Sequence, residues 1–213
     1  MLALTGYWRL TLSFSPSFIR LLGGRLCLDF VNTTSSNSEL SWEGLVFLLE
    51  ATRIVSAERG TQLLALPQSD PRTAEGLLLK ARRLSASLRK ALTAMHRKHK
   101  VIAEWIEPIN GVLRITEGHD ELISEGGAWR MEFIAREGGL DWLLAAIARS
   151  AAELLAEGTK APLRVCANPQ CGLFFYDKSR THRRRWCSMS VCGNRSKVAT
   201  FARRHSAMSS GTA

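Results

Sequence analysis

The sequence predicts a mainly α-helical N-terminal domain with one small β-hairpin, followed by a C-terminal zinc finger of the treble-clef type with four cysteine ligands. Three observations lead to this fold class. Apolar residues recur at helix spacing over several segments of residues 41–158. Residues 129–134 instead follow the two-residue period of a strand. Four of the five cysteines form two equally spaced pairs in the last third of the chain.

Length and composition indicate a globular protein of two unequal parts. The 213 residues suffice for one domain of ordinary size and a small one, and 46% of them are hydrophobic and 23% charged. No stretch approaches the ~20 apolar residues of a membrane span, and the N-terminus lacks the basic and apolar regions of a secretory signal. We therefore expect no membrane contact and a cytoplasmic location, where paired cysteines favour metal over disulfides.

The first half of the chain predicts two helices. Residues 1–20 alternate like a strand or form a loose extension, and residues 26–33 are too short a run to assign. Ser41 opens a helix that ends before Gly60. The longest helix begins after the N-cap residue Asp70, has Pro71 at its first position and continues to about His99.

The next segment predicts a hairpin. A short helix from residue 101 is expected to end at Pro108, and Asn110-Gly111 is a strong turn signal. Residues 112–116 then form a strand that pairs, across a glycine-rich connection, with the strand of residues 129–134.

A final N-terminal helix starts at Gly139 or Asp141 and ends at Gly158. The segment from Gly158 to Leu163, which contains Pro162, is the expected domain boundary. We expect a domain of residues 1–158, a finger of residues 159–206 and a disordered tail of residues 207–213.

The paired cysteines predict a structural zinc site with the ligands Cys166, Cys171, Cys187 and Cys192. Each pair has the spacing C-x4-C, and fifteen residues separate the pairs. Two thiolates from each of two tight turns suit tetrahedral Zn²⁺, and four thiolates leave no open position for a catalytic water. The alternative is two disulfides or free core thiols. Cys27 has no partner at ligand spacing and is expected to be a buried thiol.

Residues around the ligands support a metal-binding fold. Gly172 can take the positive φ that a tight turn needs, and residues 173–177 indicate a strand. From Ser188 the pattern becomes helical, which places Cys192 in the first helical turn. Because the finger has little core of its own, we expect zinc to fold it.

The net charge of +10 lies entirely in the finger. Residues 1–159 carry 18 basic and 18 acidic side chains, whereas residues 160–213 carry 11 Lys or Arg and one acid, Asp177. Phosphates are the natural counter-charge, so the partner is expected to be DNA, with RNA as the alternative. The expected contact residues are Arg183, Arg184, Arg185, Arg195, Lys197, Arg203 and Arg204. The alternative for the arginine run is a solvated loop.

Two strings resemble a known family. WCSMSVCGNRSK, residues 186–197, together with the upstream cysteine pair, resembles the CGNR zinc finger, whose name corresponds here to Cys192, Gly193, Asn194 and Arg195. LCLDFVNT, residues 26–33, is similar to the opening of the ABATE domain, which precedes that finger in bacterial proteins described as stress-induced transcription regulators. The resemblance implies DNA binding by the finger. Arg195 and Asn194 are candidates for base contacts, although Asn194 and Gly193 can instead fix the ligand turn.

Asp29 and Asn32 of the second string form a candidate polar pair in a small-molecule pocket. We favour the structural alternative, in which both side chains bond nearby backbone. No phosphate-binding loop, nucleophile elbow or HExxH pair is found, so we expect no enzyme.

Taken from the sequence, the function is that of a DNA-binding transcription regulator. Its N-terminal domain is expected to serve sensing or self-association, with a small-molecule effector and a second copy as candidate partners. The alternatives are an RNA-binding protein, a zinc-stabilised interaction module, or an enzyme with its active site in the N-terminal domain.

Overall fold

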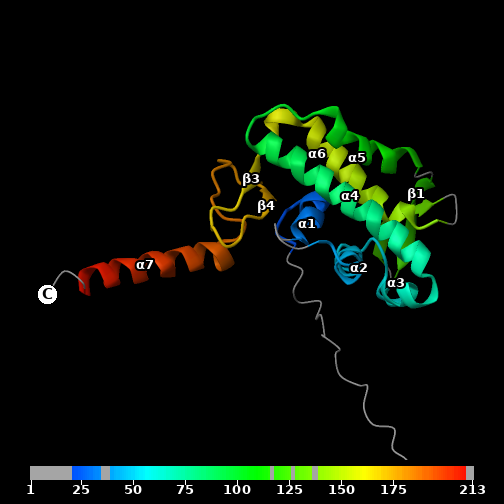
Figure 1. The fold of residues 1–213 in the computed structure, drawn as a ribbon, viewed down its shortest axis with the longest axis horizontal. Coiled ribbons are helices and arrows are strands. Elements are labelled where there is room, and N and C mark those ends of the chain that lie inside the picture. Colours follow the sequence, from blue (N-terminus) through cyan, green and yellow to red (C-terminus); the bar gives the residue numbers. More distant parts are fainter. Residues whose placement is uncertain (1–20, 35–38, 116–117, 126–127, 136–138, 210–213) are drawn as a thin grey trace, which may run out of the picture.

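The computed structural model describes residues 21–34, 39–115, 118–125, 128–135 and 139–209; the strand considered within residues 1–20 lies outside them. In the described part the fold is mainly helical with two small hairpins, which confirms the predicted class (Figure 1). None of the described helices is both long and apolar enough to cross a membrane. The elements are α1 (Leu26–Asn32), α2 (Trp42–Ala51), α3 (Ala57–Ser69), α4 (Pro71–His96), α5 (Ala103–Ile115), β1 (Gly118–Glu125), β2 (Ala128–Ala135), α6 (Ala145–Ala156), β3 (Leu163–Val165), β4 (Phe174–Tyr176) and α7 (Asn194–Ser209).

The long helix α4 organises the N-terminal domain, and it begins where the sequence predicts. Asp70 caps it by accepting a hydrogen bond from the Thr73 amide at 3.2 Å, and Pro71 occupies its first turn. Its buried face packs against α1, α2, α3 and α5. The members of that face recur every three or four residues: Ala74, Leu77, Ala81, Leu84, Ser85, Leu88, Ala91, Leu92 and Ala94.

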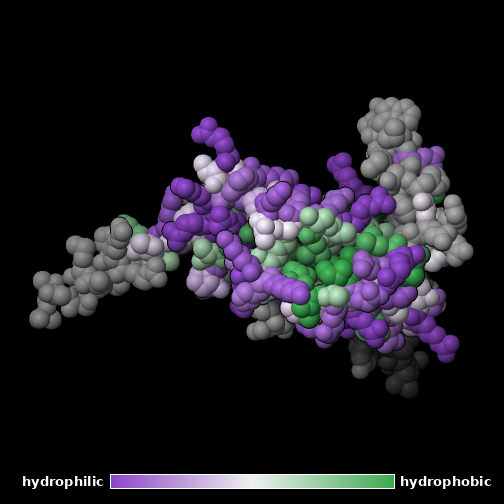
Figure 2. All heavy atoms as spheres, turned by 90° about the horizontal axis from the view of Figure 1, so that it is seen from above, coloured by the Kyte–Doolittle hydropathy of each residue, from purple (hydrophilic) through white to green (hydrophobic). Residues whose placement is uncertain are grey.

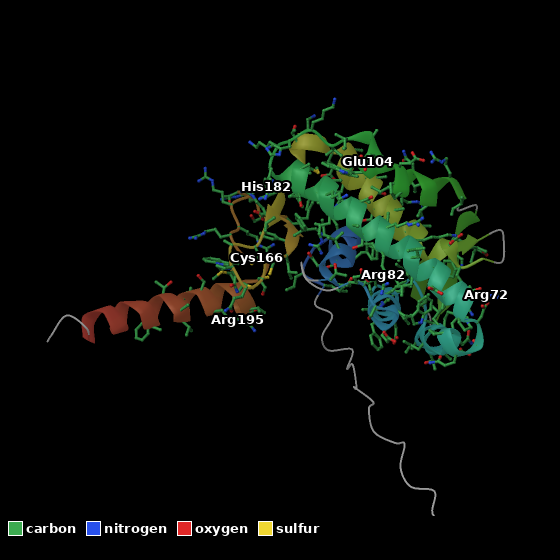
Figure 3. The ribbon with its side chains drawn as sticks, in the orientation of Figure 1. Arg72, Arg82, Glu104, Cys166, His182 and Arg195 are labelled. Atoms are coloured by element: carbon green, nitrogen blue, oxygen red, sulfur yellow. The ribbon has the colours of Figure 1, made fainter. Side chains whose placement is uncertain are left out.

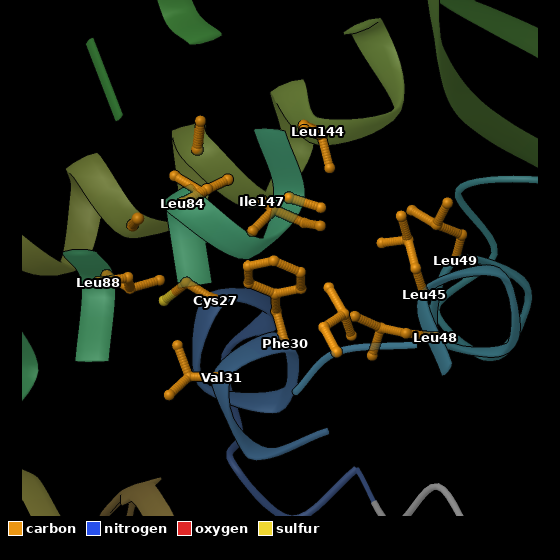
Figure 4. Close-up of a cluster of buried hydrophobic side chains, with 14 of the residues drawn as sticks. Cys27, Phe30, Val31, Leu45, Leu48, Leu49, Leu84, Leu88, Leu144 and Ile147 are labelled. Carbon is orange, nitrogen blue, oxygen red and sulfur yellow. The ribbon is translucent and has the colours of Figure 1, made fainter. Parts of the chain in front are cut away.

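The core surrounds the short helix α1, as Figure 4 shows. Phe30 of α1 is fully buried among leucines of α2 and α4 and Ile147 of α6. Burial of such a side chain contributes about 1.5–3 kcal/mol to folding. Five consecutive residues of α1, from Cys27 to Val31, are buried, so the helix shows no amphipathic period. With only seven residues and no such period, α1 could not be assigned from its sequence.

The prediction for residues 41–60 was wrong in extent. The helix that Ser41 caps ends at Ala51, and Arg53 takes a positive φ of 59° in the connection. A separate helix, α3, follows and had not been predicted. Its sequence AERGTQLLALPQS contains Gly60 and Pro67, both poor helix formers, and buries only Gly60 and Leu63. Tertiary packing against α2 and α4 outweighs the weak local preference.

The prediction that Pro108 ends a helix was also wrong. Helix α5 continues through Pro108 and the Asn110-Gly111 turn signal to Ile115, so residues 112–115 are helical and not a strand. Ile109 and Val112 are buried against the core. Their burial keeps the segment helical although Pro108 removes one helical hydrogen bond.

The N-terminal hairpin therefore uses a different first strand. β1 pairs antiparallel with β2, with Leu122 opposite Met131. The predicted second strand is confirmed within β2, whereas β1 occupies the segment that we had taken as a connection. The sequence of β1, GHDELISE, is rich in residues of low strand preference, which hid it from the pattern.

The C-terminal part begins with the hairpin β3–β4 and ends with α7, which extends away from the rest of the molecule (Figure 1). Leu163 of β3 and Phe174 of β4 belong to the N-terminal core. Helix α7 continues to Ser209, so residues 207–209 of the expected tail are helical, and residues 210–213 lie outside the described part.

Candidate metal centre and nucleic-acid interface

The structure brings together the four cysteines at which the sequence predicts zinc. One sulfur from each of Cys166, Cys171, Cys187 and Cys192 lies within 4.8 Å of the others, and all five cysteines of the chain are free of disulfides. The Sγ atoms of Cys171 and Cys187 are 3.7 Å apart, and those of Cys187 and Cys192 are 3.8 Å apart. Thiolates about 2.3 Å from a tetrahedral ion stand about 3.8 Å from one another. These two distances therefore match tetrahedral Zn²⁺, and the whole cluster is compact enough to hold one ion.

The first ligand turn, residues 166–172, is held by backbone hydrogen bonds. The amide of Cys166 donates to the Leu173 carbonyl at 2.9 Å, and the amide of Cys171 donates to the Asn168 carbonyl at 2.9 Å. Gly172 takes a φ of +62°, as the turn was predicted to require. The turn thus presents Cys166 and Cys171 on the same side before β4 begins.

The second ligand turn leads into α7. Ser188 caps it through its side chain, which accepts from the Val191 amide, and Cys192 lies in a π-helical turn, Met189–Gly193, just before α7. A Cβ atom on Gly193 would lie 2.6 Å from the Met189 sulfur, and the Asn194 side chain donates to the Ser190 carbonyl at 3.2 Å. These contacts favour the alternative in which Gly193 and Asn194 fix the turn that positions Cys192 and do not contact bases.

The protein environment affects the ligands unequally. Burial works against ionisation of Cys166, but hydrogen bonds from the Cys187 and Asn168 backbone prevail and lower its pKa. Burial and the neighbouring sulfurs of Cys171 and Cys166 raise the pKa of Cys187. Four thiolates at this spacing repel one another, so a divalent cation is the charge that would let all of them ionise.

The basic loop, residues 178–185, is organised by Asp177, a role that the sequence reasoning missed. Asp177 is fully buried, and its carboxylate accepts from the amides of Ser179 at 3.0 Å and Arg184 at 2.8 Å. Burial alone would raise the pKa of Asp177, but these hydrogen bonds and the Arg184 charge lower it. The Asp177 carbonyl also contacts Nδ1 of His182 at 2.7 Å. The sequence signal for this role was that Asp177 is the one acidic residue in a strongly basic segment.

The three consecutive arginines at the end of the loop, residues 183–185, have different surroundings. Arg184 donates from Nη2 to the Cys187 carbonyl at 2.7 Å, and its guanidinium lies 5.1 Å from the centre of the Phe175 ring. Arg185 lies over the Trp186 ring. Arg183 is exposed, and the structure gives it no such contact among the residues it describes. Arg184 thus supports the finger itself, whereas Arg183 is available to a partner.

The cysteine cluster lies between the basic loop and the first turn of α7, as the positions of His182, Cys166 and Arg195 in Figure 3 show. Arg195 and Lys197 are exposed at the start of α7. Arg203 and Arg204 lie further along the same helix. Hydrophilic residues gather at this end of the molecule in Figure 2, whereas an apolar area occupies the middle of that face.

Asp29 and Asn32, the candidate pocket pair, both bond backbone. The Asp29 carboxylate accepts from the Gly23 amide at 2.7 Å, and burial raises its pKa to about 6. Asn32 donates from Nδ2 to the Phe174 carbonyl at 2.8 Å and accepts from the Phe174 amide at 3.0 Å. Asn32 therefore joins α1 to the finger strand β4, and a pocket role for the pair stays a prediction.

A second set of contacts holds β4 to the N-terminal domain. The Tyr176 amide donates to the Gly23 carbonyl at 2.7 Å, and the Tyr176 hydroxyl donates to Glu157 at 2.8 Å. Arg25 pairs with Glu157 and lies 4.6 Å from the centre of the Tyr176 ring. The strand that follows the first ligand turn is thus fixed from two sides.

Comparison with known families matches both parts of the chain. Residues 163–205 match the model of the CGNR zinc finger, and residues 24–158 match the model of ABATE, described as "putative stress-induced transcription regulator". A search of curated proteins finds no match. The ABATE match covers more than half of the chain and the finger match accounts for most of the rest, so the chain belongs to the ABATE family and carries a C-terminal CGNR zinc finger.

Proposed function

We propose that this protein is a cytoplasmic transcription regulator that binds DNA through its zinc finger and has no enzymatic activity. The observation that carries the proposal is the burial of Asp177. It is the one acidic residue in residues 160–213, and it is fully buried against the backbone of the basic loop. The exposed charges of the finger's described part are therefore all positive, which suits a polyanion.

In this proposal zinc and the loop have separate roles. Zn²⁺ held by the four cysteines joins the two ligand turns and so fixes where α7 begins. Arg183 from the loop and Arg195 and Lys197 from α7 then contact phosphates, and Arg203 and Arg204, further along α7, are proposed as additional contacts. Such contacts position a protein on a duplex without selecting a sequence.

The test measures duplex binding of the full chain over a series of salt concentrations. The full chain is used because the finger strand β4 is hydrogen-bonded to α1 of the N-terminal domain. Duplex affinity measured by fluorescence anisotropy should fall with salt, and the log–log slope should become shallower by about 0.9 for each phosphate contact removed. Arg183→Ala and Arg195→Ala should each show this change. Arg72→Ala, an exposed arginine at the far end of α4, is the matched control (Figure 3).

Two results would overturn the proposal. One is duplex affinity that does not depend on salt. The other is an equal loss for Arg72→Ala and Arg183→Ala. Competition between the DNA duplex and a structured RNA of equal length tests which polymer is the partner. If the RNA binds more than about tenfold more tightly than the DNA, the partner is RNA.

A further inference from the structure

The N-terminal domain has a hollow of about 460 Å³ on the outer side of α4, and the sequence analysis did not foresee it. One wall is a stripe of α4 at helix spacing, and Trp105 from the start of α5 also lines the hollow. The residues that line it are Ala86, Arg89, Lys90, Thr93, Ala94, Arg97, His99 and Trp105. The lining thus combines small apolar side chains and one large aromatic ring with several cationic groups.

The charge of this hollow is one-sided. Arg89, Lys90 and Arg97 line it together with His99, and no Asp or Glu is among its lining residues. The ion pairs found in the described part of the chain involve none of these three cations. Elsewhere on α4 a lysine is neutralised, since Lys80 pairs with Asp141 at 2.7 Å. Within the described ranges of the chain, the cations of the hollow therefore have no acidic partner at ion-pair distance.

Arg89 is the most constrained of these cations. Its guanidinium is partly buried and donates to the carbonyls of Val31 and Thr34 and to the Thr34 hydroxyl, the latter two at 2.9 Å. These acceptors are neutral, and burial lowers the pKa of Arg89. A half-buried cation that is solvated only by neutral oxygens gains most from a nearby anion.

We propose that the hollow between α4 and Trp105 binds a small organic anion, with a carboxylate or phosphate facing Lys90 and Arg97 and a flat apolar body against Trp105. Its size is within the range of small-molecule sites, and such sites combine apolar walls with a few convergent polar groups. The position also matters to the rest of the chain. Arg89, which also lines the hollow, donates to the Val31 carbonyl at the end of α1, and the next residue, Asn32, is bonded to Phe174 of the finger strand β4.

The test uses the full chain with 2-naphthoate as the probe and follows the tryptophan fluorescence, to which Trp105 is one of six contributors. Its neutral analogue 2-naphthamide tests the need for charge, and inorganic phosphate tests the need for an apolar body. We expect saturable binding of naphthoate and binding of naphthamide weaker by about tenfold, because a carboxylate near two cations gains about 1.4 kcal/mol or more. Phosphate should compete with naphthoate if phosphate monoesters are the preferred class.

Variants locate the site. Lys90→Glu and Arg97→Glu should each weaken naphthoate binding by about tenfold. Trp105→Phe should remove the fluorescence change. Arg83→Glu makes the same charge reversal at an exposed α4 residue outside the hollow and should leave binding unchanged. The proposal is overturned if naphthamide binds as well as naphthoate, if Arg83→Glu matches Arg97→Glu, or if neither anion binds below about 10 mM.

Discussion

Replacing Asn32 with Ala tests how the two parts of the chain are joined. The side chain makes two hydrogen bonds to Phe174, at 2.8 Å and 3.0 Å, and Phe174 is only 5% exposed. Without Asn32 the amide and carbonyl of Phe174 would lose their partners in a buried position. Each such orphaned group costs about 1–3 kcal/mol, so we expect the free energy of unfolding to fall by about 2–4 kcal/mol.

The assay is urea unfolding of the zinc-loaded full chain, followed by circular dichroism, with amide hydrogen exchange at Phe174 as a local readout. Thr61→Ala is the control, because it removes one side-chain hydrogen bond at an exposed position of α3 and should cost below about 1 kcal/mol. The reasoning fails if Asn32→Ala unfolds within about 0.5 kcal/mol of the original chain, or if Phe174 exchange is unchanged.

Three further outcomes follow from the geometry. Cys171→Ser and Cys192→Ser should each lower the zinc content of the purified protein, measured by elemental analysis. Removal of zinc by a chelator should speed amide hydrogen exchange in residues 186–202 while the amides of β3 and β4 stay protected. Because the folded-state pKa of Asp29 is raised to about 6, its contribution to stability is complete below pH 4 and is lost as the pH rises through 6. The original chain should therefore lose about 1 kcal/mol more stability than Asp29→Asn between pH 5 and 7, measured by urea unfolding. Asp177→Asn raises the net charge by one but replaces one of the two carboxylate oxygens that accept from the Ser179 and Arg184 amides with an NH2 donor. We expect the loop to lose order and the duplex affinity to fall; tighter binding would show that net charge outweighs loop order.

The sequence predicted those helices whose signals are local. Asp70, Pro71 and the apolar stripe that follows them define α4 without reference to the rest of the chain. It failed where tertiary contacts override local preference. Pro108 and Asn110-Gly111 are strong breakers in isolation, yet burial of Ile109 and Val112 keeps α5 helical through them.

The site shows the same division between local and distant determinants. The cysteine spacing suffices to place four sulfurs together, because each pair closes a turn of its own. The partners of Asn32, Arg89 and Asp177 depend instead on which backbone atoms the fold brings near, and Asn32 meets Phe174 across 142 residues. Sequence spacing carries no signal for a hydrogen bond of that kind, so the hollow at Arg89 could not be predicted.

The buried apolar residues form two clusters, and this separation bears on which part of the finger needs the metal to fold. Leu163 of β3 and Phe174 of β4 are buried in the N-terminal core, so the hairpin is stabilised by apolar contacts that exist without zinc. The second core cluster differs, since three of its four buried members in the described chain are the ligands Cys166, Cys187 and Cys192, with Phe175 as the fourth. Apolar burial around one phenylalanine is worth only about 1.5–3 kcal/mol, which is little against about 1–2 kcal/mol of backbone entropy for each ordered residue. We therefore expect zinc to matter most from Trp186 onward, where it would fix the start of α7 and with it the placement of Arg195 and Lys197.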